Sequence, residues 1–289
     1  MHDGEVATDE ALVRRLIAAQ FPQWARLPVE RISSAGTNNA IYRLGPELAV
    51  RLPRIADAIE QVEFEYAWLP RLAPYSPVAV PEPVALGQPA EGYPWRWAVN
   101  RWVDGRTAVE DDADRPGFAV DLGEFVAALR RADVTGGRPG YRSGSLRTRD
   151  AYVREWTTAA RDVVDTGAVL AAWEEALAAP AWDGPPVWTH GDLLTGNVLV
   201  RDGRLAGVID FGAAGVGDPA CDAIPAWAVL SAGTRDAFRA AAGFDDATWA
   251  RGRGWALTFV AGLTYYRETN PVMAGIARRA IDAVLATPA

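Results

Sequence analysis

The segment WTHGDLLTGNVLVRDGRLAGVIDFG, residues 188–212, contains a cluster of polar side chains around two short apolar runs. Residues 198–200 and 205–209 have the composition of strands, and Asp202-Gly203 between them is a dipeptide typical of tight hairpin turns. The sequence therefore predicts an antiparallel hairpin. This hairpin places Asn197, just before its first strand, near Asp210, at the end of its second strand.

Asn197 and Asp210 would present an amide oxygen and a carboxylate at one end of this hairpin. Such hard ligands suit Mg²⁺ better than zinc, and Mg²⁺ commonly takes further ligands from water and phosphate. Asp192, five residues before Asn197, can accept a proton from a hydroxyl without being a metal ligand. Phosphoryl transfer needs this division between a metal site and a separate base.

The same residues carry a resemblance to known enzymes. HGDLLTGN, residues 190–197, is similar to the His-x-Asp-x₄-Asn catalytic loop of protein kinases, and Asp210-Phe211-Gly212 is similar to their metal-binding Asp-Phe-Gly. Gly191 and GVIDFGAAGVGDPACD, residues 207–222, look much more like the aminoglycoside phosphotransferase family of small-molecule kinases. The motif match is specific over 186–222, and the rest of the chain matches as a two-lobed plan.

The resemblance implies an α+β, two-lobed, protein-kinase-like fold. Its N-lobe, residues 1–103, would have a small mixed β-sheet and bind the nucleotide. Its larger, mainly helical C-lobe, residues 104–289, would carry the catalytic loop and the acceptor site. Carried over residue by residue, Asp192 is the catalytic base, Asn197 and Asp210 hold Mg²⁺, and His190 orients the loop. We interpret Asp218 and Asp222 as capping or loop-anchoring groups.

Local patterns agree with this plan. Residues 29–34, 39–44 and 47–53 read as a meander of three antiparallel strands, followed by a helix over 55–73 and strands in 83–87 and 95–103. An N-terminal helix is capped by Thr8 or Asp9. Residues 135–147 read as a loop. The C-lobe helices are predicted at 121–132, 149–164, 167–179, 249–268 and 271–286.

The loop between the first two strands is the candidate phosphate-binding element. Its small and polar residues let backbone N–H groups approach phosphate oxygens. We expect contacts from Ser34, Gly36, Thr37 and Asn38. The adenine is expected against the segment that ends the fifth strand, with backbone contacts from Asn100, Trp102 and Val103. These contacts leave the choice between ATP and GTP open.

The cation of the nucleotide site is a departure from the family. The resemblance implies a lysine on the third strand, but all 29 basic residues of this chain are arginine. Arg51 is the candidate, with Arg54 as the fallback and a solvated strand arginine as the alternative. Glu65, on the following helix, is the expected ion-pair partner, ahead of Glu63. Arginine is forked and wider than lysine, so its phosphate contacts should differ.

Composition limits the partners. A net charge of −8 argues against nucleic acid, and no apolar run is long enough to span a membrane. The polar N-terminus and the single cysteine, Cys221, fit a cytoplasmic protein. The expected partners are therefore a nucleoside triphosphate and a small hydroxylated acceptor.

The acceptor is not readable from the motifs. The resemblance allows aminoglycosides, macrolides, choline, homoserine or sugars, and an antibiotic is plausible. Three acidic residues suit a polycation, whereas the aromatic residues suit a partly apolar acceptor or simply a helical core. The acids are Asp245, Asp246 and Glu268, and the aromatics are Trp227, Trp249, Trp255, Phe259, Tyr265 and Tyr266.

Two other function classes remain open. Because Arg51 replaces lysine, the chain could be a catalytically inactive kinase-like protein that binds a nucleotide or another ligand. Metal-assisted hydrolysis by His190 and Asp192 is a third possibility, but it lacks sufficient metal ligands.

Overall fold

The structure is a computed structural model that describes residues 5–32 and 38–286. The chain forms two compact units. Unit 1 comprises Met1–Pro74 and Ala79–Asp104, and unit 2 comprises Tyr75–Val78 and Gly105–Ala289. In the described residues, no helix combines the length and the apolar character needed to cross a membrane.

Unit 1 contains a five-stranded sheet with the order β1-β2-β3-β5-β4. The predicted three-stranded meander is confirmed, but every pairing is antiparallel, so the expectation of a mixed sheet was wrong. The reason is the path of the chain: β5 returns from β4 and inserts antiparallel to both β3 and β4. The elements are α1 (Glu10–Gln20), β1 (Val29–Ile32), β2 (Asn39–Leu44), β3 (Leu48–Pro53), α2 (Ile59–Leu72), β4 (Pro83–Gly87) and β5 (Trp97–Arg101).

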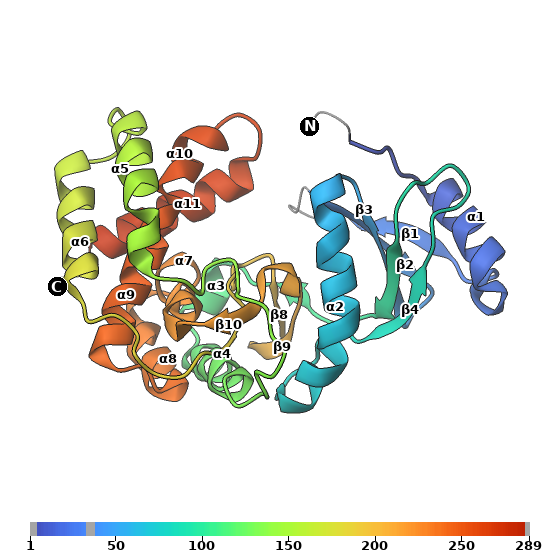
Figure 1. Cartoon of the computed structure of the whole chain (residues 1–289), viewed down its shortest axis with the longest axis horizontal. Coiled ribbons are helices and arrows are strands. Elements are labelled where there is room, and N and C mark those ends of the chain that lie inside the picture. Colours follow the sequence, from blue (N-terminus) through green and yellow to red (C-terminus); the bar gives the residue numbers. More distant parts are fainter. Residues whose placement is uncertain (1–4, 33–37, 287–289) are drawn as a thin grey trace. The chain divides into compact units, whose positions relative to one another are not determined.

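The two faces of this sheet differ in character. One face packs against α1 to form an apolar core that includes Leu16, Tyr42, Val50, Leu52 and Trp97. Helix α1 begins where the Asp9 side chain accepts a hydrogen bond from the N–H of Leu12, at 2.7 Å. Helix α2 covers the other face (Figure 1), where strand alternation places Arg51 of β3 and Asn100 of β5.

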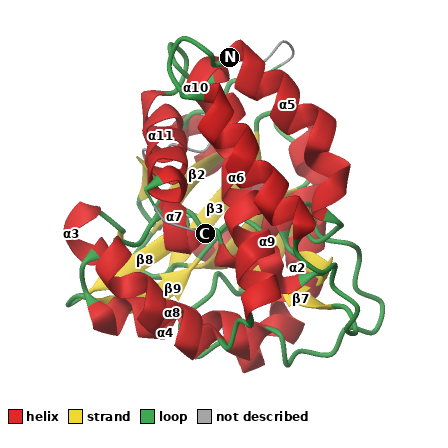
Figure 2. Ribbon diagram, turned by 90° about the vertical axis from the view of Figure 1, so that its left-hand side faces the viewer, coloured by secondary structure: helices red, strands yellow, loops and turns green. Residues whose placement is uncertain are grey.

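Unit 2 is mainly helical, with short strands that support the loops of the motif region (Figures 1 and 2). Its helices are α3 (Glu110–Ala113), α4 (Pro116–Leu129), α5 (Asp150–Ala159), α6 (Thr166–Ala178), α7 (Pro225–Ala228), α8 (Arg235–Ala242), α9 (Asp246–Leu257), α10 (Gly262–Tyr265) and α11 (Pro271–Leu285). Its strands are β6 (Arg106–Thr107), β7 (Val187–Thr189), β8 (Val198–Arg201), β9 (Arg204–Val208) and β10 (Gly215–Gly217).

One predicted helix is broken. The single helix expected over 249–268 is divided into α9, a 3₁₀ turn at Thr258–Ala261, and α10. The Thr258 hydroxyl donates to the carbonyl of Trp255 at 2.7 Å, which supports the tighter turn. Gly262 follows, and a Cβ there would lie 2.8 Å from the Cβ of Ala277 on α11. The break therefore lets the backbone approach α11 closely, which apolar periodicity does not reveal.

The hairpin predicted at Asp202-Gly203 is present. Strands β8 and β9 pair antiparallel, with Val198 opposite Val208 and Arg201 opposite Arg204. Asp202 and Gly203 have φ values of 53° and 73°, so both turn residues occupy the left-handed region. Such turns match the twist of the flanking strands, and Asp-Gly adopts them readily. The turn therefore fixes the register that brings Asn197 and Asp210 to the same end.

We expect Gly203→Ala to lower the free energy of unfolding by about 1–2 kcal/mol, because an L side chain is strained in the left-handed region. Urea unfolding followed by circular dichroism measures the change. Gly233→Ala is the matched control, since a Cβ at Gly233 would meet no heavy atom within 4 Å and the φ of Gly233 is not positive. Equal stability of the two variants would show that the turn conformation does not constrain the hairpin.

Candidate active site

The end of the β8–β9 hairpin brings two predicted site residues into direct contact. The Nδ2 of Asn197 donates to the main-chain oxygen of Asp192 at 2.8 Å and to its Oδ2 at 2.9 Å. The N–H of Ile209 donates to the carbonyl of Asn197 at 2.9 Å, which ties the loop to the residue before Asp210. With its amide N–H groups directed at Asp192, Asn197 keeps its Oδ1 as an acceptor for another group.

Asp210 has a φ of 63°, in the left-handed region that few non-glycine residues adopt. It begins the 3₁₀ turn Phe211–Ala213, directly after the residue bonded to Asn197. Backbone strain of this kind clusters at functional sites, where the surrounding structure enforces it. The strained turn sets the direction in which the carboxylate leaves the hairpin.

His190 is a structural part of the loop. Its Nδ1 accepts from the N–H of Asp192 at 3.2 Å, so the proton is assigned to Nε2, which lies 3.1 Å from the carbonyl of Ile209. The ring is fully buried and packs edge-on against Phe211, with centroids 4.6 Å apart. Nδ1 therefore holds the backbone of the loop itself, and Nε2 joins the loop to the residue that follows β9, as the orienting role predicts.

Asp222 anchors the same loop through its backbone N–H groups. Its two carboxylate oxygens accept the N–H groups of His190 at 2.9 Å and Gly191 at 2.7 Å. Burial raises the pKa of Asp222, while those N–H groups and His190 act in the opposite direction. Asp218 caps a 3₁₀ turn and pairs with Arg251 at 2.8 Å. The two acids thus have the capping and anchoring roles that the sequence suggested.

Arg142 is a site residue that the sequence reading missed. Its Nη1 donates to Asp192 Oδ1 at 2.9 Å and to the carbonyl of Gly191 at 2.7 Å. Its guanidinium lies 5.0 Å from the ring centroid of Tyr141 and 5.3 Å from that of Phe259. Each carboxylate oxygen of Asp192 therefore has one protein donor, from Arg142 and from Asn197. An arginine in a Gly- and Ser-rich loop has no characteristic spacing that predicts this contact.

The loop that carries Arg142 is fixed against the strand that follows Asp210. The N–H of Tyr141 donates to the carbonyl of Ala213 at 3.1 Å, and Ser143 Oγ donates to the carbonyl of Val216 at 2.8 Å. A Cβ on Gly215 would lie 2.4 Å from the nitrogen of Gly140, so the close approach requires glycine. Gly140 and Gly215 are therefore the feature of the sequence that could have indicated that these two segments lie close together.

In unit 1, the predicted ion pair is present. Arg51 Nη1 lies 2.8 Å and 2.7 Å from the two carboxylate oxygens of Glu65, and both side chains are buried. The second choices are engaged elsewhere, since Arg54 pairs with Glu5 and Glu63 pairs with Arg96. Arg51 is therefore not a solvated strand arginine.

Most of the other predicted nucleotide-binding residues of unit 1 lie outside the described residues or have backbone partners within the protein. Ser34, Gly36 and Thr37 lie outside the described residues, and Asn38 is held by the N–H of Arg54 on its carbonyl at 2.8 Å. The N–H of Trp102 donates to the carbonyl of Glu47 at 2.8 Å, so a backbone contact between Trp102 and a base would use the carbonyl of Trp102. That N–H closes the end of the sheet, a pairing that a strand-end pattern cannot specify.

Asn100 and Val103 remain compatible with a base. Asn100 lies in β5, between β3 and β4, and is 4% exposed, and its buried Oδ1 has no hydrogen-bond partner in the described structure. A buried amide oxygen without a partner is costly, so it is an acceptor available to a bound donor. The N–H of Val103, just past β5, is in none of the hydrogen bonds found among the described residues.

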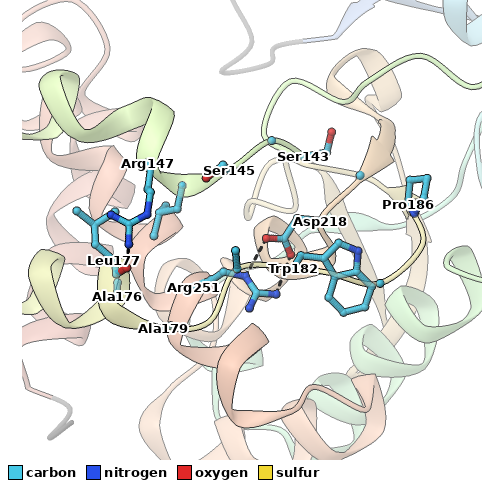
Figure 3. A pocket seen from close by; sticks show the side chains of 15 residues that line it. Ser143, Ser145, Arg147, Ala176, Leu177, Ala179, Trp182, Pro186, Asp218 and Arg251 are labelled. Carbon is cyan, nitrogen blue, oxygen red and sulfur yellow. Dashed lines mark hydrogen bonds and ion pairs between the residues drawn. The ribbon is translucent and has the colours of Figure 1, made fainter.

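A cavity of about 280 Å³ lies in unit 2 beside the loop that carries Arg142. Its wall includes the buried pair of Asp218 and Arg251, which point toward each other beside Trp182 (Figure 3). Arg251 also donates to the carbonyl of Pro180 and to Thr248 Oγ1, so its polar groups are satisfied within the protein. The predicted base and metal ligands do not line this cavity.

The oxygen donors at this site suit a magnesium ion whose remaining coordination positions are filled by water and phosphate. No group of three His, Cys, Asp or Glu side chains able to hold a metal occurs among the residues that the structure describes. The candidates are instead one carboxylate, on Asp210, and one amide oxygen, on Asn197. Hard oxygen donors in this small number fit Mg²⁺, which retains water and phosphate ligands.

Comparisons with known proteins agree with this geometry. The model of the phosphotransferase enzyme family matches residues 29–255. An aminoglycoside 3′-phosphotransferase of Escherichia coli is 26% identical over 231 residues, which cover 72% of this chain and 78% of that protein.

Two similar solved structures share the fold at low identity. Aminoglycoside 2′-phosphotransferase-IIIa in complex with GDP has a TM-score of 0.73 and 20% identity, and the match covers 96% of this chain and 99% of that one. The macrolide 2′-phosphotransferase MphH from Brachybacterium faecium has a TM-score of 0.62 and 22% identity, covering 97% and 100%.

The chain belongs to the phosphotransferase enzyme family. It is a small-molecule O-phosphotransferase with the two-lobed, kinase-like α+β fold of the aminoglycoside and macrolide enzymes. The resemblance inferred from residues 190–197 and 207–222 is therefore confirmed.

We expect Asp222→Ala to destabilise the protein by about 3 kcal/mol, because two buried N–H groups lose their acceptors. Urea unfolding measures this loss. Asp162→Ala, at an exposed position, is the control and should change stability by less than about 0.5 kcal/mol. A stable Asp222→Ala protein with an unchanged unfolding curve would contradict the anchoring role.

Proposed function

We propose that this enzyme transfers the terminal phosphoryl group of ATP or GTP to a hydroxyl of a small molecule, with Asp192 as the base. The observation that carries the proposal is the arrangement of Asp192. Its carboxylate is held by Arg142 and Asn197, yet its side chain is 27% exposed, so a hydroxyl can reach it. An antibiotic is the favoured acceptor class, since the relatives act on aminoglycosides and macrolides.

Asp192 would orient the acceptor hydroxyl and receive its proton as the oxygen attacks the terminal phosphorus. The hydrogen bonds from Arg142 and Asn197 prevent the carboxylate from rotating away, so the attack geometry is set before the acceptor binds. Each oxygen accepts one bond from these residues, which leaves lone pairs for the incoming hydroxyl. His190 is not the base, because its Nδ1 accepts a main-chain hydrogen bond and its Nε2 faces a carbonyl.

Asn197 Oδ1 and the Asp210 carboxylate would hold Mg²⁺. When bound, the ion would neutralise charge on the phosphate oxygens of the nucleotide. The hydrogen bonds from Asn197 to Asp192 direct its amide oxygen away from the base. The base and the metal ligands are thus adjacent and coupled, but they use different atoms.

On unit 1, Arg51 would contact the nucleotide phosphates, with Glu65 holding its guanidinium. Its buried pairing supports this role in place of lysine and weakens the alternative of an inactive kinase-like protein. Asn38 and the residues before it would lie against the phosphates. Asn100 and Val103 would bind the base. GDP is bound in one similar structure and ADP in another, so either nucleotide is compatible.

We further propose that the enzyme works in the cytoplasm and has no nucleic-acid or membrane partner. Support comes from the net charge of −8 and from the single cysteine. Cys221 is buried, and burial raises the pKa of its thiol, which disfavours the reactive thiolate.

Asp192→Asn should lower kcat about 1,000-fold, because the amide cannot accept the proton, while nucleotide affinity changes little. Coupled nucleotide turnover with Mg²⁺ gives kcat, and titration calorimetry gives the affinity. Asp202→Asn, in the exposed hairpin turn, is the matched control and should retain full activity. Collapse of nucleotide affinity in a folded Asp192→Asn protein would contradict the assignment of the base.

Asp210→Asn should raise the Mg²⁺ concentration that gives half-maximal activity at least about tenfold, because one anionic ligand is lost. Asparagine tolerates the left-handed conformation found at this position, so folding should be preserved. The measurement is turnover across a Mg²⁺ titration. Activity that no longer depends on the metal concentration would remove the proposed site.

A further inference from the structure

A surface of aromatic side chains lies beside Asp192 in unit 2. We call it the tyrosine surface, and it comprises Tyr141, Tyr152, Trp156, Tyr265 and Tyr266. Tyr141 is 63% exposed, Tyr265 57% and Tyr152 40%, which places them among the most exposed large hydrophobic side chains described. They come from three separate segments: the loop over 135–147, helix α5 and the end of α10.

Four of the five rings form a connected group. Trp156 lies between Tyr152 and Tyr265, with centroid distances of 6.3 Å and 6.4 Å, and Tyr265 lies 4.9 Å from Tyr266. Trp227 and Trp255 are fully buried, so the interpretation of these two aromatic residues as part of a helical core is confirmed. Tyr265 is not part of that core, and its exposure needs another explanation.

Arg142 connects the tyrosine surface to Asp192. Its guanidinium stacks on Tyr141 at 5.0 Å and bonds to Asp192 at 2.9 Å. Burial raises the pKa of Tyr266, and Tyr265, Tyr141 and Asp192 raise it further, while Arg142 lowers it. An acceptor on these rings would therefore lie next to Asp192.

The two charged groups that lie over the ring of Tyr141 are both arginines, Arg142 and Arg149. The charge of Arg142 is matched by Asp192. Arg149 lies 5.1 Å from the ring of Tyr141 and donates to the carbonyl of that residue at 3.0 Å. Among the described residues no ion pair involves Arg149, so no carboxylate neutralises the charge of its guanidinium. A polycation placed on these rings would be repelled by it.

The acids that would suit a polycation lie elsewhere. Asp245 caps α9, accepting from the N–H of Thr248 at 2.6 Å, and Asp246 pairs with Arg239. Figures 1 and 2 both show α8 at the end of unit 2 opposite α5 and α10. Glu268, two residues after Tyr266, is exposed and is the acid of the three that belongs to the same segment as the tyrosine surface.

We propose that the tyrosine surface binds the acceptor, and that it selects an uncharged or singly charged glycoside with apolar ring faces over a polycationic one. The proposal rests on the function proposed above, because it assigns the ligand by its nearness to Asp192. Saturated ring faces pack on aromatic faces, and phenol hydroxyls bond the hydroxyls at their edges. Arg149 disfavours the competing polycation, so attraction and repulsion act together.

The first test compares two acceptors with the full chain, Mg²⁺ and either ATP or GTP. Erythromycin, a singly charged macrolide, represents the proposed class, and kanamycin represents polycations. We expect kcat/KM for erythromycin to exceed that for kanamycin roughly 100-fold. A preference for kanamycin overturns the proposal, and so does the absence of turnover with both probes.

The second test locates the site. Tyr141→Ala keeps the main-chain hydrogen bond to Ala213 and should raise KM for erythromycin about tenfold, with KM for the nucleotide unchanged. Tyr75→Ala removes an exposed tyrosine outside the tyrosine surface and should have no effect. Equal KM values for the two variants would overturn the assignment of the surface.

The third variant separates charge from stacking. Arg149→Glu should raise kcat/KM for kanamycin at least about tenfold without improving erythromycin, because a repulsive cation becomes an anion. Glu268→Gln should leave erythromycin turnover unchanged. Unchanged kanamycin turnover in Arg149→Glu would remove the electrostatic half of the proposal.

These outcomes are distinguishable from failure of the proposed function. If Asp192→Asn retains full turnover of a probe, the base assignment fails, whatever the acceptor preference. If turnover requires Asp192 but favours kanamycin and is unaffected by Tyr141→Ala, phosphoryl transfer stands and the acceptor class is wrong.

Discussion

The pair of hydrogen bonds from Asn197 to Asp192 is the contact on which the rest of the active site depends. It closes the loop at the open end of the β8–β9 hairpin, and it fixes both the carboxylate of Asp192 and the amide of Asn197. Because the amide N–H groups are used on Asp192, the amide oxygen is left for a metal ion. A single side chain therefore separates the position of the proposed base from the position of the proposed cation.

The loop is built from both sides to keep this contact in place. Asp222 accepts the N–H groups of His190 and Gly191, while His190 joins the loop to the end of β9. Arg142 holds the second oxygen of Asp192 from a loop about 50 residues earlier in the chain. Such preorganisation is what phosphoryl transfer requires, since the protein contributes positioning and charge rather than covalent chemistry.

Arginine has been put to two distinct uses in this lysine-free chain. Arg51 is buried with Glu65 in unit 1, where the family resemblance implies a lysine. Arg142 donates from Nη1 to a carboxylate and to a carbonyl while the face of its guanidinium stacks on Tyr141. The second arrangement combines ion pairing and ring stacking, which a lysine ammonium cannot do in the same geometry. The same stacking brings the exposed Tyr141 next to Asp192.

Local sequence was sufficient for the hairpin and the meander of β1 to β3, and for the choice of Asp192, Asn197 and Asp210 as candidate site residues. The reason is that turn chemistry, strand alternation and motif spacing are all properties of neighbouring residues. The sequence also predicted the Arg51–Glu65 pair, because a strand and the following helix are close along the chain. It did not predict the break after Leu257 or the use of the Trp102 N–H within the sheet.

Only the tertiary structure showed Arg142 at Asp192, the tyrosine surface, and the two N–H groups through which Asp222 anchors the loop. These contacts join segments that are far apart in sequence, and they depend on close approaches such as Gly140 against Gly215. No periodicity or spacing encodes a contact between two loops, since its geometry is set by how the helices and strands that carry them pack. The motif therefore determined the chemistry, whereas packing decided which side chains surround the base.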